Sequence, residues 1–367
     1  MKNIVRQNIL NVRNYVPGKP IEEVQREEGL KEVIKLASNE NCLGSSPKAV
    51  AAVRKSIKDI NRYPDASAFY LKKKLAKFLG VNEDGIILGN GSDEVIGMAV
   101  RTFVDSGDEV VIAKPTFLIY EIVSQLHSAK IRFVPLARDL KHDLKAMKEA
   151  ITEKTKMVFI ANPDNPTGTY VTKSELENFL EGIPSRTIVF LDEAYFEFAD
   201  YEKKDYPNGL DYLDMPNLIV SRSFSKVYGL AGLRIGYGIS CPEVISYVER
   251  TREPFNVNLL AQAAAIAALD DKAFLKRTLA HVGREKKFLY SEFRKMKLSY
   301  VASATNFVII DAKADCKKVF ASLLKEGVIV RDMKAWGFDT LIRVTIGTRK
   351  ENEKFIRALK KVLSRKL

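Results

Sequence analysis

Short runs of β-branched and other apolar residues alternate with helical patterns through the middle of the chain, and this alternation restricts the possible folds most. The apolar runs lie at residues 86–88, 110–113, 131–134, 157–161, 188–191, 218–221 and 235–239. The helical patterns between them lie at residues 93–103, 116–127, 143–150 and 173–180. Strands and helices in alternation predict βαβ units. We therefore expect an α/β fold with a mainly parallel sheet covered by helices.

A different pattern in the last third of the chain predicts a second domain. An Ala-rich helical stretch at residues 259–270 precedes charged helices and short strands at 307–310 and 342–344. The chain of 367 residues also exceeds the size at which a single core usually stops growing. We expect an N-terminal arm that contributes to the small domain, a large α/β domain and a small α+β domain, at residues 1–44, 45–255 and 256–367.

Composition excludes several classes of function. The net charge is +13, but the basic residues are spread along helical stretches such as 71–78 and 354–366, where solvated faces explain them. We therefore expect no nucleic-acid partner. The sequence has neither the apolar core of a secretory signal nor the about 20 apolar residues of a membrane span, so we expect a cytoplasmic protein without a membrane partner. Three scattered cysteines and three histidines predict no disulfide framework and no metal site.

The residues that follow the predicted strands are unusually polar and small. Ligands of open α/β sheets gather at the carboxyl ends of the strands, so these segments are candidates for a site. Gly91, Ser92 and Asp93 form a turn that opens a helix. Such a turn can hold a phosphate with its free N–H groups, although it can also be an ordinary helix cap.

Three further strand ends carry polar groups of the same kind. Their side chains belong to Asn165, Asp192, Tyr195, Ser223, Ser225, Lys226 and Arg234. A carboxylate delivered by an apolar strand, such as that of Asp192, normally requires a cationic partner. Taken alone each residue is a weak signal, because the loop of Asn165 can be only a rigid turn and most lysines of a basic chain lie on the surface.

The order of these residues is more specific than any one of them. The set Gly91-Ser92-Asp93, Asn165, Asp192-x-x-Tyr195, Ser223-x-Ser225-Lys226 and Arg234 resembles the motifs of fold-type I pyridoxal-phosphate aminotransferases. The segments 35–41, 62–65, 252–256 and 341–348 are similar to those of histidinol-phosphate aminotransferases, over nearly the whole chain. This resemblance implies a fold-type I transferase with pyridoxal 5′-phosphate as its cofactor.

The resemblance also implies a role for each residue around the cofactor. Lys226 would bond to the cofactor's aldehyde, which needs a primary amine, and would later shuttle a proton. Asp192 would keep the pyridine nitrogen protonated, while Asn165 and Tyr195 would hydrogen-bond the phenolic oxygen. The phosphate would be held by Gly91, Ser92, Asp93, Ser223, Ser225 and Arg234. Phe117 would lie against the ring, although it is equally well a core residue at a helix start.

Substrate binding and assembly follow from the same resemblance. Arg343 and Arg331 match arginines that grip the anionic groups of the substrate, although an arginine ending a strand can also be a surface ion-pair member. Tyr15 would belong to an N-terminal arm that closes over the substrate, and Asn165 would contact the substrate as well as the cofactor. Tyr63 matches a tyrosine that reaches the phosphate from the neighbouring subunit, which implies a homodimer with shared active sites.

The leading hypothesis is a transamination in histidine biosynthesis. L-histidinol phosphate would give its amino group to 2-oxoglutarate, forming imidazole acetol phosphate and glutamate. The alternatives are an aminotransferase for phenylalanine or tyrosine, a decarboxylase of the phosphothreonine type, and a cofactor-binding regulator. The regulator is disfavoured because the sequence has no N-terminal DNA-binding extension.

Overall fold

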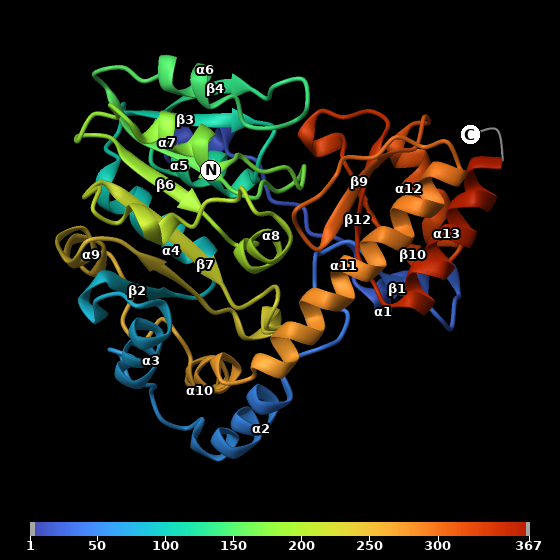
Figure 1. Cartoon of the computed structure of the whole chain (residues 1–367), viewed down its shortest axis with the longest axis horizontal. Helices are drawn as coiled ribbons and strands as arrows, with labels where there is room; N and C mark the ends of the chain where they lie inside the picture. The colour runs from blue at the N-terminus through green and yellow to red at the C-terminus, as the bar shows by residue number, and fades with distance from the viewer. Residues whose placement is uncertain (1–3, 365–367) are drawn as a thin grey trace.

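The computed structural model describes residues 4–364, and its largest element is a seven-stranded sheet (Figure 1). The strand order is β2-β8-β7-β6-β5-β3-β4. The strands span β2 Ile86–Gly89, β3 Glu109–Lys114, β4 Lys130–Pro135, β5 Thr155–Ala161, β6 Ile188–Asp192, β7 Leu218–Ser223 and β8 Gly236–Ile239. All neighbouring pairs are parallel except those that β8 makes with β2 and β7. The mainly parallel sheet expected from the sequence is confirmed.

Helices cover both faces of this sheet. Because successive side chains of a strand point to opposite faces, the central strands contribute to two cores. Phe159 and Phe190 pack with one group of helices, whereas Val158 and Leu191 pack with the other. The first group is α4 Ser92–Phe103, α5 Leu118–Leu126 and α9 Pro242–Glu249. The second is α3 Phe69–Leu79, α6 Leu144–Glu149, α7 Lys173–Leu180 and α8 Phe196–Glu202. Burial on both faces explains why the strands are apolar throughout.

The last third of the chain forms a second group of elements, which an early segment joins. Its antiparallel sheet has the order β11-β12-β9, and a two-stranded parallel sheet pairs β1 with β10. These strands are β1 Ile34–Lys35, β9 Phe307–Asp311, β10 Val328–Ile329, β11 Arg331–Asp332 and β12 Leu341–Thr345. The accompanying helices are α1 Ile21–Glu28, α12 Cys316–Lys325 and α13 Arg349–Ser364.

Two consecutive helices connect the large sheet to this second group. Helix α10, Leu259–Leu269, packs on α2, Pro47–Ser56, and on α3. Helix α11, Lys272–Lys295, then runs from this corner toward β9 and β12 (Figure 1). The division at residue 256 stays a prediction. Helix α10 follows that boundary, yet it packs against helices that precede it.

The helices predicted between the strands are found close to their expected ends. Helix α7 begins after Thr172, whose side chain forms a capping box with Glu175. The helix expected from residue 116 instead begins at Leu118, because the backbone of Phe117 is extended. Within residues 4–364, no helix has the length and apolar character that crossing a membrane requires.

Candidate active site

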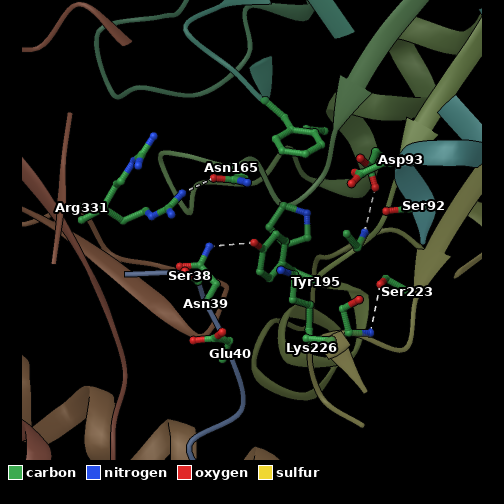
Figure 2. A pocket seen from close by; sticks show the side chains of 18 of the residues that line it. Ser38, Asn39, Glu40, Ser92, Asp93, Asn165, Tyr195, Ser223, Lys226 and Arg331 are labelled. Atoms are coloured by element: carbon green, nitrogen blue, oxygen red, sulfur yellow. Dashed lines mark hydrogen bonds between the residues drawn. The ribbon is translucent and has the colours of Figure 1, made fainter. Parts of the chain in front are cut away.

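A cavity of about 260 Å³, partly open to solvent, lies where β5, β6 and β7 end (Figure 2). The last residues of these strands, Ala161, Asp192 and Ser223, line it. Apart from Gly91 and Tyr63, the cavity brings together all the predicted site residues, namely Tyr15, Ser92, Asp93, Phe117, Asn165, Asp192, Tyr195, Ser223, Ser225, Lys226, Arg234, Arg331 and Arg343. Side chains separated by hundreds of residues in sequence therefore share one site.

Asp192 ends β6 with a buried, fully hydrogen-bonded carboxylate. The Tyr120 hydroxyl donates to Oδ2 at 2.6 Å, and the Ser221 hydroxyl and the Ala194 N–H donate to Oδ1 at 3.0 and 3.1 Å. Burial raises the pKa of Asp192, against the opposing effect of these hydrogen bonds. Within residues 4–364 no cationic side chain pairs with Asp192. A buried carboxylate in this state favours a ligand that places a positive charge beside it.

Lys226 lies in the loop after β7, on the wall of the same cavity. Its Nζ is 5.3 Å from the centre of the Tyr195 ring and forms no hydrogen bond with any residue of the described chain (Figure 2). Lys226 is also the only lysine among the described residues that line the cavity. The Tyr195 hydroxyl accepts a hydrogen bond from Asn39 Nδ2 at 2.8 Å, so its own proton remains free to donate. The site thus holds an available primary amine beside an available phenol.

The start of α4 provides a cradle for an anion. Gly91 adopts a φ of 83°, and Ser92, which lines the cavity, begins the twelve-residue helix, whose first N–H groups have no partner within the helix. A Cβ at Gly91 would lie 2.5 Å from Arg234 Nη2, so any other residue would push that guanidinium aside. Arg234 pairs with Asp93 at 3.2 Å. Gly91 therefore supports the cradle from behind rather than lining the cavity.

Two further hydroxyls come from the end of β7 and the loop that follows it. Ser223 and Ser225 both line the cavity, and the Ser225 N–H donates to Ser223 Oγ at 3.0 Å. Hydroxyls, helix N–H groups and one guanidinium form a donor set that suits a phosphate.

Arg331 and Arg343 form the opposite side of the cavity. They are directly paired residues of β11 and β12. Arg331 donates to the Val16 carbonyl at 2.7 Å, and Arg343 donates to the Ala37 carbonyl at 3.0 Å and to Asn165 Oδ1. Neither forms an ion pair within residues 4–364, and Arg343 Nε is buried without a partner. Burial lowers the pKa of Arg343, and the charge of Arg331 lowers it further. This pair of cations needs an anion.

The donor set fits pyridoxal phosphate, the cofactor that the sequence resemblance implies. The buried Asp192 carboxylate, which has no cationic partner among the described residues, lines the cavity. The phosphate cradle at the start of α4 and the free amine of Lys226 line the same cavity. Asn165 Oδ1 accepts a hydrogen bond from Arg343, which leaves Asn165 Nδ2 available as a donor in the cavity that Tyr195 also lines. The chemistry of each group therefore matches an aromatic cofactor with a phosphate, an aldehyde and a ring nitrogen.

Sequence reasoning missed several residues of the cavity. Tyr120 lies in the first turn of α5, three residues after the N-cap Phe117, and the sequence predicted a helix there without assigning Tyr120 to the cavity. Trp336 comes from the loop between β11 and β12, and its sequence carries no signal for this position. Asn39 has a φ of 56°, which an isolated sequence does not reveal. Ser38 and Glu40 also line the cavity.

Tyr63 lies away from the cavity of its own chain. It is 81% exposed and stacks on Phe255, with ring centres 4.6 Å apart. The sequence assigned Tyr63 to the site of a neighbouring subunit, and one chain does not test that role. Its role stays a prediction.

Comparisons with known proteins point to one family. Residues 31–359 match the family described as aminotransferase class I and II. The chain is 50% identical to histidinol-phosphate aminotransferase of Moorella thermoacetica, over 98% of this chain and 93% of the relative. It is 49% identical to histidinol-phosphate aminotransferase 2 of Carboxydothermus hydrogenoformans, over 98% and 99%. The crystal structure of histidinol-phosphate aminotransferase from Sinorhizobium meliloti in complex with pyridoxal-5′-phosphate superposes with a TM-score of 0.89, at 29% identity and 98% coverage of both chains.

Proposed function

Because this chain belongs to the aminotransferases of class I and II, and within them to the histidinol-phosphate aminotransferase family, we propose that it transfers the amino group of L-histidinol phosphate to 2-oxoglutarate. The products are imidazole acetol phosphate and glutamate, in histidine biosynthesis. The cofactor is pyridoxal 5′-phosphate. An enzyme of this metabolism is expected in the cytoplasm, where its substrates are made.

The chain's residues divide the chemistry among them. When bound, the cofactor supplies an aldehyde that bonds to amines and a ring that draws electrons from the substrate's α carbon. Lys226 Nζ would hold the cofactor in the resting enzyme and, once substrate has replaced it, would take a proton from the substrate's α carbon as a general base. Asp192 would keep the ring nitrogen protonated. Asn165 Nδ2 and the Tyr195 hydroxyl would donate to the phenolic oxygen.

The remaining residues hold and orient the bound molecules. Ser92, Ser223, Ser225 and Arg234 all line the cavity and would bind the cofactor's phosphate. Phe117 lines the cavity at the start of α5 and would pack against the cofactor ring. Amino donor and oxo acceptor use this single site in turn, so the kinetics are expected to be ping-pong.

The arginine pair carries the proposal for the substrate. Arg331 and Arg343 offer two guanidinium groups on neighbouring strands, and in the described chain no carboxylate neutralises them. Two guanidinium groups, each with several N–H donors, suit a phosphate ester, which carries about two negative charges. The same groups suit the carboxylates of 2-oxoglutarate in the other half-reaction. Tyr15 lines the cavity beside them from the N-terminal arm.

Comparing amino donors tests this substrate directly. With 2-oxoglutarate as acceptor, kcat/KM is expected to be higher for histidinol phosphate than for phenylalanine. A preference for phenylalanine would replace the leading substrate by the aromatic alternative. Release of carbon dioxide from threonine phosphate would favour the decarboxylase instead.

Removing one arginine separates the donors further. The Arg331→Ala variant should lose at least about tenfold in kcat/KM for histidinol phosphate, because a charge-assisted hydrogen bond contributes about 1.5–3 kcal/mol. Phenylalanine lacks the phosphate and should be affected less. Arg357→Ala, which removes an exposed arginine of α13, is the matched control. Equal losses for both donors would contradict the role given to Arg331.

A homodimer is the proposed assembly. Large apolar side chains are exposed together along residues 57–70, where a second copy can cover them: Ile57, Ile60, Tyr63, Phe69 and Tyr70. Tyr63 would then reach the cofactor phosphate of that second copy. Mixing two inactive variants, Lys226→Ala and Tyr63→Ala, should restore activity, because the mixed dimer contains one intact site. No recovery after subunit exchange, with Tyr63→Ala impaired alone, would argue against a shared site.

A further inference from the structure

Trp336 occupies the junction between the two arginines and the start of α5. It belongs to the short 3-10 helix η6, Lys334–Trp336, between β11 and β12, and it is 92% buried. One side of its ring packs on Ile309 and Met333, and the ring also lines the cavity. No role in the chemistry described above requires it. The residue is therefore a candidate for a separate function in the site.

The ring of Trp336 lies close to both guanidinium groups. The guanidinium carbon of Arg331 is 5.3 Å from the ring centre, and that of Arg343 is 5.8 Å away. Like charges directly opposite each other on neighbouring strands repel, and in the described chain neither arginine has a carboxylate partner. A tryptophan face attracts cations, most strongly where water is excluded. Trp336 is thus placed to offset the repulsion and to hold the two groups together.

A hydrogen bond fixes the ring in this position. Trp336 Nε1 donates to the Thr116 carbonyl at 2.9 Å, across 220 residues of sequence. Thr116 precedes Phe117 on the cavity wall, and its hydroxyl donates to the buried Asp164 carboxylate at 2.5 Å. The orientation of the ring is therefore set by the large sheet's side of the cavity, while its arginine neighbours come from β11 and β12.

The two arginines differ in how else they are held. Arg343 is buried and bonded to Asn165 and to the Ala37 carbonyl, whereas Arg331 is partly exposed and bonded to the Val16 carbonyl of the N-terminal arm. Without the Trp336 ring, Arg343 keeps two hydrogen-bond partners and the Phe307 ring, whose centre is 5.1 Å from its guanidinium carbon. Arg331 keeps one hydrogen-bond partner among the described residues, the Val16 carbonyl, on a segment without regular structure. Loss of Trp336 should therefore displace Arg331 first.

We propose that Trp336 is a positioning residue that determines donor specificity, by holding Arg331 beside Arg343 so that the pair grips a doubly charged phosphate ester in preference to a single carboxylate. This inference rests on the proposed function, because it explains how that site selects a phosphorylated amino donor. A donor with one carboxylate needs only Arg343 and gains little from the ring.

Kinetics of two Trp336 variants test the proposal. In Trp336→Leu, kcat/KM for histidinol phosphate should fall by about tenfold, equivalent to about 1.4 kcal/mol, through a higher KM at nearly unchanged kcat. For phenylalanine the change should stay below about threefold, since the second guanidinium is not used. Trp336→Phe keeps an aromatic face and should recover most of the loss. Phe338→Leu removes an aromatic ring from the same apolar cluster without touching the cavity, and should match the wild type.

Several outcomes would overturn the proposal. Equal losses for both donors in Trp336→Leu would reduce Trp336 to a general packing role. A fall in kcat at unchanged KM would indicate a disturbed cofactor rather than a disturbed arginine pair. A loss of kcat/KM in Phe338→Leu as large as that in Trp336→Leu would show that the effect comes from disrupting the apolar cluster that contains both residues.

A binding measurement separates this inference from the proposed substrate. Inorganic phosphate is titrated into the holoenzyme, whose cofactor site is occupied, and binding is followed by calorimetry. Trp336→Leu and Arg331→Ala should each weaken phosphate binding by at least about fivefold, with Phe338→Leu unchanged. Equal affinity in wild type and Trp336→Leu would overturn the inference even if histidinol phosphate is the substrate. Weakened phosphate binding without turnover of histidinol phosphate would instead remove the proposed substrate.

Discussion

Replacing Tyr120 by phenylalanine removes the shortest hydrogen bond to Asp192 and little else. The Tyr120 hydroxyl donates to Asp192 Oδ2 at 2.6 Å, and burial raises the pKa of Tyr120 well above its usual value, so the phenol keeps the proton that it donates. The ring itself is fully buried and stacks on Phe159, with centres 4.6 Å apart. A phenylalanine fits the same space. The change therefore isolates one donor to the carboxylate.

The size of the effect follows from the state of Asp192. A hydrogen bond to a charged group contributes about 1.5–3 kcal/mol, which corresponds to about 1–2 pKa units of the acceptor. Burial already raises the pKa of Asp192, and losing a donor to the charged form raises it further. A higher pKa means that a higher pH is needed to ionise Asp192. The cofactor's affinity should consequently fall by about tenfold or more at neutral pH.

The assay compares the pH dependence of kcat/KM in wild type and Tyr120→Phe, together with cofactor affinity from visible absorbance. The acidic limb should move upward by about one pH unit. Tyr290→Phe is the matched control, because its hydroxyl accepts from the Ser303 N–H at 2.8 Å outside the cavity. An unchanged acidic limb with wild-type cofactor affinity would refute the reasoning about Asp192.

Two further variants test the phosphate cradle and a buried carboxyl. Gly91→Ala should weaken cofactor binding by about tenfold or more, because an alanine at the φ of 83° costs about 1–3 kcal/mol and its Cβ would displace Arg234. The control Gly97→Ala places its Cβ in open space and should leave cofactor binding unchanged. If both variants bind the cofactor with the same affinity, the phosphate does not bind at the start of α4. Burial raises the pKa of Glu197 to about 7 in the folded protein. The protonated carboxyl therefore stabilises the folded state fully below pH 4.5, and this contribution is lost as the pH rises through 7. The stability of Glu197→Gln relative to wild type should therefore be greater at pH 8.5 than at pH 5, by at most about 3 kcal/mol in the free energy of unfolding by urea. A stability difference that is the same at both pH values would contradict the raised pKa of Glu197.

The sheet and most of the site could be predicted from sequence for the same reason. Strands covered on both faces leave continuous apolar runs; Asp192 ends one such strand, and Lys226 lies in the loop after another. Their position at strand ends converts linear order into proximity. The motif order that resembles a known family then narrows the chemistry.

Residues brought in by tertiary contacts left no comparable signal. Trp336 reaches the cavity through a contact with Thr116, 220 residues away, and no local spacing encodes that distance. Tyr120 faces Asp192 only because α5 packs on this side of the sheet. The two-residue strand β1 exists through pairing with β10 rather than through its own pattern. Such features depend on packing between segments that are remote in sequence.

The proposed chemistry depends on Lys226 holding the cofactor in the cavity that Asp192 also lines. Borohydride reduction of the yellow holoenzyme fixes the cofactor to its lysine, and mass spectrometry of the digested protein identifies that residue. We expect the modification on the peptide that contains Lys226 and on no other lysine. Modification of a different lysine, or none in protein saturated with cofactor, would contradict it.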